Sequence, residues 1–93
     1  MQTTRFDVTD HLSTHEEQVA YLEAAFEDGD PSLVAAAIGD IARARGASEF
    51  ARASGLSRET IYKTLVPGGN PTLDTVAKAA KALGVRLSLT RAD

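Results

Sequence analysis

Residues 48–65 read SEFARASGLSRETIYKTL and place a single glycine, Gly55, between two short helical patterns. Serine side chains cap helix N-termini, so Ser48 and Ser57 predict one helix before Gly55 and a second one after it, running to about Val66. Glycine tolerates the positive φ angle that a sharp turn between two helices requires. This stretch therefore predicts two helices that fold back on each other about Gly55.

The residues around this turn have the types that a helix-turn-helix requires. Ala51 is small enough to let the second helix approach the first closely. Apolar residues at the right offsets, Phe50, Leu56 and Ile61, would hold both helices against a core. Together with Gly55, they predict a helix-turn-helix that binds DNA. A purely structural helical hairpin remains the alternative.

The polar face of the second helix fits readout of the DNA major groove. Arg58 can donate two hydrogen bonds to guanine, and Glu59 can accept one from the cytosine amino group. Lys63 can reach a base or a phosphate, while Tyr62 offers a flat ring and a hydroxyl. Hydroxyls and backbone N–H groups at the helix start can bond phosphate oxygens. The predicted DNA-binding residues are Ser57, Arg58, Glu59, Thr60, Tyr62 and Lys63.

Capping signals and apolar spacing predict three further helices. Thr14 with Glu17 forms a capping-box pattern, Asp30–Pro31 is a strong helix start, and Thr72 can cap a last helix that ends at Gly84. The five predicted helices are followed by VRLSLT at 85–90, whose alternation is typical of a half-buried strand. The expected fold is all-α with five helices and a short C-terminal strand.

The predicted strand has no second strand to pair with in its own chain. Unpaired backbone groups are costly to bury. We therefore expect this segment to pair with its copy in a homodimer, through Val85, Leu87 and Leu89.

Length and composition predict one small globular domain. The chain has 93 residues, of which 43% are hydrophobic and 25% charged, and it contains no cysteine. It opens without an apolar signal segment and has no run of the ~18 apolar residues that a membrane span needs. These features predict a cytoplasmic protein without disulfides or a membrane partner.

The charge is divided between the two ends of the chain. Residues 1–30 hold one base and eight acids, a net charge of −7, whereas residues 31–93 hold nine bases and five acids, a net charge of +4. This division predicts an acidic N-terminal arm with the first helix, and a basic helix-turn-helix domain after it. The two surfaces would serve different partners. A solvated surface without a partner is the simpler alternative.

No constellation typical of an enzyme is present. His11 and His15 have a metal-ligand spacing but lie on either side of the Thr14 cap, so we expect surface histidines rather than a metal site. The pair Gly68–Gly69 lacks the lysine of a phosphate-binding loop. We therefore expect a non-enzyme without a cofactor.

Nearly the whole chain, about residues 5–90, resembles the addiction-module antidote family. The most specific matches are GDP (29–31), ARARG (42–46), GLSRETIYKTL (55–65), NPTLDTV (70–76) and ALGVRL (82–87). The resemblance implies a lambda-repressor-like helix-turn-helix and a cytoplasmic dimer that represses its own operon. It also implies neutralisation of a RelE/ParE-like toxin. Ala47 stands where many members carry methionine, a departure that leaves the DNA-reading positions intact.

The acidic residues 1–30, called the acidic front below, form the expected toxin-binding surface. The reason is that such toxins are generally basic, as the resemblance implies. Its candidate apolar anchors are Phe6, Val8, Leu12 and Tyr21. For each of them, packing on the chain's own core is an equal alternative. A stand-alone phage-type regulator without a toxin remains the alternative function, and a protein-binding module with a vestigial helix-turn-helix is a third.

Overall fold

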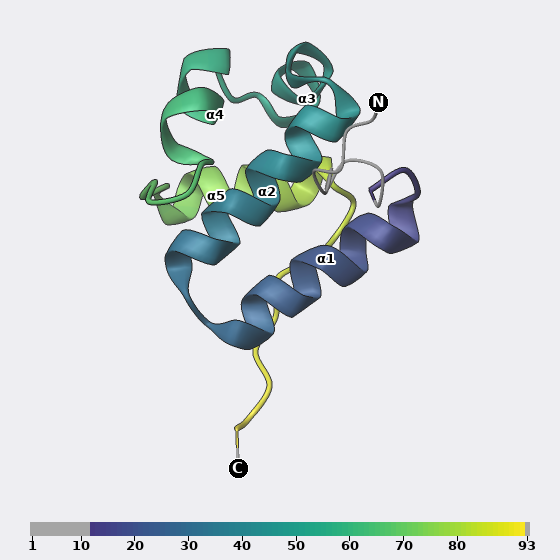
Figure 1. The fold of residues 1–93 in the computed structure, drawn as a ribbon, viewed down its shortest axis with the longest axis vertical. Helices are drawn as coiled ribbons and strands as arrows, with labels where there is room; N and C mark the ends of the chain where they lie inside the picture. Colours follow the sequence, from purple (N-terminus) through teal and green to yellow (C-terminus); the bar gives the residue numbers. More distant parts are fainter. Residues whose placement is uncertain (1–11, 93) are drawn as a thin grey trace, which may run out of the picture.

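The computed structural model describes residues 12–92, and this part of the chain forms five α-helices (Figure 1). They are α1 His15–Asp28, α2 Pro31–Arg45, α3 Ala47–Ser54, α4 Arg58–Thr64 and α5 Leu73–Ala82. α1 and α2 lie side by side and antiparallel. α3 follows at the C-terminal end of α2 with α4 beside it, and α5 crosses behind α2. The predicted all-helical fold with five helices is confirmed.

Four of the helices begin where the sequence predicted, each with a side chain that caps its N-terminus. Thr14 accepts a hydrogen bond from the Glu17 backbone N–H, and the Glu17 carboxylate accepts one from Thr14, which completes the predicted capping box. Hydrogen bonds from Thr14 and then from Ser13 hold the pKa of Glu17 below its usual value. In the same way, Asp30 caps α2, Ser57 caps α4 and Thr72 caps α5.

The start of α3 and the end of α4 differ from the prediction. α3 begins at Ala47, with Gly46 as its N-cap and no side-chain cap, so Ser48 lies inside the helix. Gly46 has φ 98°, which lets the chain pass directly from α2 into α3. α4 ends at Thr64, because Leu65 leaves the helical conformation with ψ 58°.

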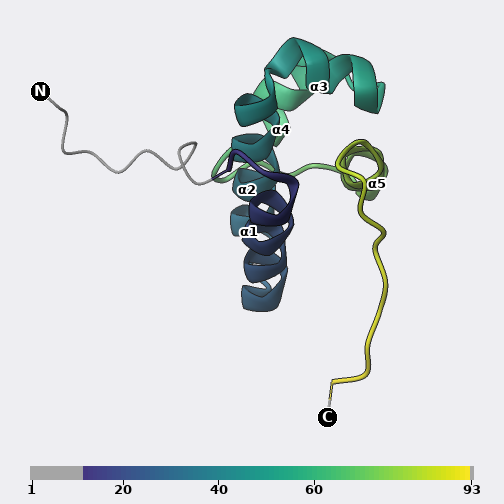
Figure 2. The same ribbon diagram turned by 90° about the vertical axis from the view of Figure 1, so that its right-hand side faces the viewer.

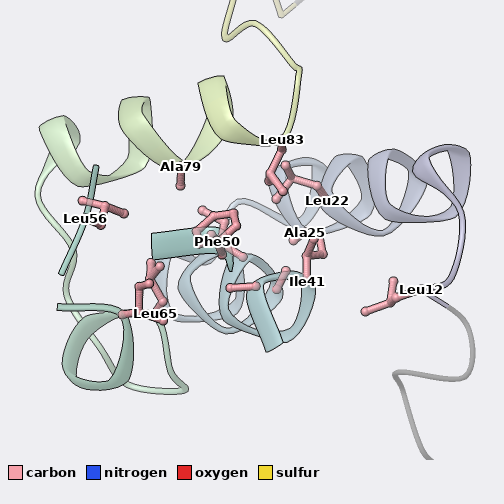
Figure 3. Close-up of a cluster of buried hydrophobic side chains, with 13 residues drawn as sticks. Leu12, Leu22, Ala25, Ile41, Phe50, Leu56, Leu65, Ala79 and Leu83 are labelled. Carbon is pink, nitrogen blue, oxygen red and sulfur yellow. The ribbon is translucent and has the colours of Figure 1, made fainter. Parts of the chain in front are cut away.

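One hydrophobic core joins all five helices (Figure 3). Phe50 lies at its centre and is 1% exposed. Leu22 and Ala25 of α1 pack into the same core as Leu83, which follows α5. The first helix is therefore part of the same hydrophobic unit as the rest of the described chain. Removing a buried ring such as that of Phe50 typically costs ~3–5 kcal/mol.

α2 and α4 approach closely where a glycine faces a carbonyl group. Gly39 lies in α2, and a Cβ atom at this position would overlap the backbone carbonyl of Leu65, the C-cap of α4. Only glycine, which has no side chain, allows α2 and the end of α4 to come this close. Gly39 thus fixes the end of α4 against α2.

The predicted C-terminal strand is absent from the described part of the single chain, residues 12–92. The Val85 N–H donates to the Ala80 carbonyl at 3.0 Å, and beyond this bond the chain leaves α5 as an irregular segment (Figure 2). A strand needs a partner for its backbone groups, and the described residues of one chain supply none. The pairing of residues 85–90 with a second copy stays a prediction.

Candidate nucleic-acid interface

α3, Gly55 and α4 form two short helices connected by a tight turn. Gly55 adopts the left-handed conformation with φ 79°, and its N–H donates to the Ala51 carbonyl at 2.9 Å. The Leu56 N–H donates to the Ser54 hydroxyl at 3.1 Å, which closes the turn. Gly55 therefore has the positive φ angle that the sequence predicted for it.

Three apolar side chains fasten this unit to the core, as the sequence predicted. Phe50 and Ile61 are buried almost completely, and Leu56 is 8% exposed. Ala51 packs against the same core from α3. With its inner side fixed in this way, α4 carries an outer side that faces solvent.

The exposed side of α4 carries Arg58, Glu59, Tyr62 and Lys63. Arg58 and Tyr62 lie one turn apart and contact each other. The Arg58 guanidinium lies 5.6 Å from the centre of the Tyr62 ring, and its Nη2 donates to the Tyr62 hydroxyl at 3.3 Å. A cation over an aromatic ring is attracted by about 0.5–1 kcal/mol at an exposed site. The ring thus restrains the arginine on the open face of the helix.

The second pair on this face is ionic. Lys63 Nζ lies 3.6 Å from Glu59 Oε2, and both side chains are mostly exposed. Exposed pairs of this kind contribute only about 0.3–0.5 kcal/mol. Such a weak partner can be exchanged for a phosphate group at little cost.

The two hydroxyl residues predicted to bond phosphate, Ser57 and Thr60, take part in the cap of α4 in the free chain. Ser57 Oγ accepts from the Thr60 N–H at 3.0 Å and donates to Thr60 Oγ1 at 2.9 Å. Ser57 is exposed and Thr60 half-buried. Their positions at the start of α4 match the prediction, and their first role in the free chain is to hold that start.

The predicted toxin-binding residues are spread over different environments. Phe6 and Val8 lie outside the described residues. Leu12 is 2% exposed and packs in the core, which is the alternative that the sequence left open for it. Tyr21 is half-buried on α1 and donates to Asp40 Oδ2 of α2 at 2.6 Å. Burial and this hydrogen bond raise the pKa of Tyr21 to about 12.

Leu12 is held in place by a polar contact that the sequence did not indicate. Gln18 is buried and donates to the Leu12 carbonyl at 3.0 Å, while it accepts from Arg45 Nε at 2.8 Å. Arg45 Nη1 also donates to the Ala82 carbonyl at 3.2 Å. One arginine therefore joins the entry of α1 to the end of α5. The partners are 27 and 37 residues apart, so no local pattern could reveal them.

The predicted dimer residues lie along the C-terminal segment. Val85 is half-buried and packs on the core, Leu87 is 41% exposed, and Leu89 is fully exposed. The sequence did not predict that this segment lines a groove with α1, whose walls include Phe26 and Leu87.

Sites of other kinds are scarce in the described chain. His15 is the exposed first residue of α1, and His11 lies outside the described residues. Between residues 12 and 92, no three potential metal ligands gather. Over the same range, every helix is too short or too polar to cross a lipid bilayer.

Comparison with known proteins covers nearly the whole chain. A protein of Haemophilus influenzae (strain ATCC 51907 / DSM 11121 / KW20 / Rd), called "Uncharacterized protein", is 44% identical over 88 residues, which cover 95% of this chain and 91% of that protein. No solved structure matches the chain significantly. The family model described as "Probable addiction module antidote protein" matches residues 2–91. The chain therefore belongs to the addiction module antidote family.

Proposed function

We propose that this protein is a cytoplasmic antitoxin that represses its own operon as a dimer and neutralises a RelE/ParE-like toxin. The observation that carries the DNA-binding part is the unit α3–Gly55–α4. Its inner side is fixed to the core, and its outer side presents Arg58, Tyr62 and Lys63 to solvent. This is the arrangement that a helix-turn-helix uses to insert its second helix into the major groove.

The role of each side chain follows from its chemistry. Arg58, restrained on the Tyr62 ring, supplies a planar donor pair for guanine O6 and N7. Lys63 exchanges its weak contact with Glu59 for phosphate or a base edge. Ser57 and Thr60 keep the helix start rigid at the DNA backbone.

A dimer fits the same proposal. Two copies of α4 placed one DNA turn apart, ~34 Å, would read a two-fold operator. We propose that residues 85–90 become strands when they pair with each other across the dimer, because their backbone groups then find partners. The family membership supports a toxin partner, and the acidic front of −7 favours a basic one.

The experiment measures binding of the protein to its own promoter DNA at several salt concentrations. We expect Arg58→Ala to lose about 1–3 kcal/mol of discrimination at one base pair per half-site. Lys63→Ala should weaken binding to all sequences similarly and lower the salt slope by about 1. Lys78→Ala is the matched control, because Lys78 pairs with Asp74 four residues away on α5 as Lys63 pairs with Glu59 on α4.

The control variant should bind like the wild type. Wild-type binding by both Arg58→Ala and Lys63→Ala would show that α4 is not the reading helix.

A further inference from the structure

A groove of about 930 Å³ lies between α1 and residues 85–90. Figure 2 shows the C-terminal segment running beside α1 after it leaves α5. Its lining is mainly apolar: Val19, Leu22 and Phe26 contribute from α1, and Val85, Leu87 and Leu89 from the segment. The groove is distant in sequence from the α3–α4 unit and shares none of its residues.

Several large apolar side chains in this groove are exposed to solvent. Phe26 is 43% exposed, Leu87 41% and Leu89 100%. Single exposed hydrophobic residues are common, but a group of them along one groove marks an interaction surface. Phe26 is the natural anchor, because aromatic side chains dominate the affinity of protein interfaces.

The charged residues beside these apolar side chains indicate what kind of partner would bind in the groove. Glu23 and Glu27 of α1 belong to the groove lining, which contains one base, Arg86. The last turn of α1 holds no basic residue, although the C-terminal end of a helix carries partial negative charge. Glu27 and Asp28 therefore sit at the helix end where acids are unfavourable. A positively charged partner would relieve this repulsion.

A second copy of the chain fits the groove less well. In a two-fold contact the same patch meets itself, so Glu23 and Glu27 of both copies would gather in one interface, with only Arg86 of each copy in the lining to offset them. Pairing of residues 85–90 through their backbone edges, as proposed for the dimer, does not fill the groove itself.

We propose that this groove is the docking site for the toxin, and that it takes a cationic segment of that protein. This rests on the proposed antitoxin function. An apolar side chain of the segment packs between Phe26 and Leu87, and neighbouring lysines or arginines pair with Glu23 and Glu27. The C-terminal segment is anchored by the Val85–Ala80 hydrogen bond.

The experiment titrates the purified full-length chain with the RelE/ParE-like toxin that the proposed function assigns to it, at low and high salt. We expect Phe26→Ser to weaken binding roughly 10- to 100-fold at both salt concentrations. The double variant Glu23→Lys/Glu27→Lys should weaken it about tenfold at low salt and remove most of the salt dependence. Leu73→Ser, on a leucine that is 78% exposed on α5, should bind like the wild type.

Stability separates this effect from misfolding. The double variant removes two acids from the C-terminal half of α1 and places one cation, at position 27, in its last turn, so its melting temperature should rise while its toxin binding falls. Glu16→Lys reverses a charge in the first turn of α1 and should do the opposite, lowering the melting temperature and leaving toxin binding within about twofold.

Two results would contradict the groove proposal without contradicting the antitoxin function. One is wild-type affinity for the toxin in both groove variants. The other is a change of oligomeric state in Phe26→Ser with toxin affinity unchanged, which would assign the groove to a second copy. If the wild-type chain itself neither binds this toxin nor protects cells from it, the antitoxin function fails, and the groove proposal fails with it.

Discussion

The hydroxyl of Tyr21 joins α1 to α2 through Asp40, which Arg43 also contacts at 2.8 Å. The folded chain raises the pKa of Tyr21 to about 12, whereas a tyrosine in an unfolded chain ionises near pH 10. A pKa raised by folding stabilises the protein fully below the unfolded pKa, and this contribution is lost as the pH rises through the folded pKa. Tyr21 therefore stabilises the fold below about pH 10 and ceases to do so near pH 12.

Replacing Tyr21 by phenylalanine tests this contact. Tyr21→Phe removes one hydrogen bond to a charged acceptor at a half-buried site, and we expect a loss of about 1.5 kcal/mol of unfolding free energy near neutral pH. The difference from the wild type should shrink between pH 10 and pH 12. Urea unfolding across this range measures it, with Tyr62→Phe as background so that Tyr21 is the single tyrosine left of two. A difference that stays constant up to pH 12 would contradict the assignment.

The contact between α2 and α4 depends on the missing side chain of Gly39. Alanine would add about 1 kcal/mol of helix propensity, but its Cβ would overlap the Leu65 carbonyl. Overpacking costs ~1–3 kcal/mol or more, and a backbone carbonyl yields less than a flexible side chain. The clash should prevail, and we expect Gly39→Ala to lose about 2 kcal/mol of unfolding free energy and to displace α4.

Thermal melts and operator binding together measure this effect. Gly29→Ala is the control, because Gly29 has φ 84° and open space around its Cβ position. We expect the control to cost about 1–2 kcal/mol through backbone strain alone and to leave operator affinity unchanged at temperatures where it is folded. Unaltered DNA binding by Gly39→Ala would show that α4 does not depend on this contact.

Four of the helix starts could be predicted, because each of these four depends on neighbouring residues. The capping hydrogen bonds of Thr14 and Ser57 reach three residues along the chain, within the range of a sequence pattern. The start of α3 could not, since Gly46 allows the helix to follow α2 directly, and a serine two positions later looks like a cap in sequence alone. Leu73 is an apolar residue that the core does not use, because its position at the first residue of α5 leaves it 78% exposed.

Of the two candidate sites, one could be predicted from the sequence and the other could not. The outer side of α4 follows from the helical period once Ile61 is known to face inward. The groove does not, because it brings α1 together with residues 85–90 from the other end of the chain. The tertiary arrangement alone shows that Phe26 and Leu87 share one surface and that Leu12 is in the core.

At the scale of the molecule, α1 is not a detachable arm. Leu22 and Ala25 of α1 pack with residues of the other helices, and Leu12 joins them. Each buried leucine typically contributes ~2–5 kcal/mol, a large share of the ~5–15 kcal/mol by which folded domains are stable. We therefore expect residues 31–93 alone to be unfolded, without the cooperative thermal transition of the full chain in circular dichroism.

This expectation decides how neutralisation should be tested. Truncation at residue 31 would remove Leu12, Leu22 and Ala25 from the core together with the acidic surface, so its failure to protect cells would not locate the toxin site. Point variants such as Phe26→Ser change the surface and keep α1. A cooperative melt of residues 31–93 at the wild-type temperature would contradict the shared core.

The single residue between α2 and α3 has a mechanical consequence. Gly46 is at once the C-cap of α2 and the N-cap of α3, so no slack loop separates them, and a tilt of α2 is carried into α3. Because α1 lies along α2 (Figure 1), a partner that displaced α1 would tilt α2 and move the α3–α4 unit with it. In a two-fold assembly, such a tilt would change the distance between the two copies of α4, and with it their match to the pitch of DNA.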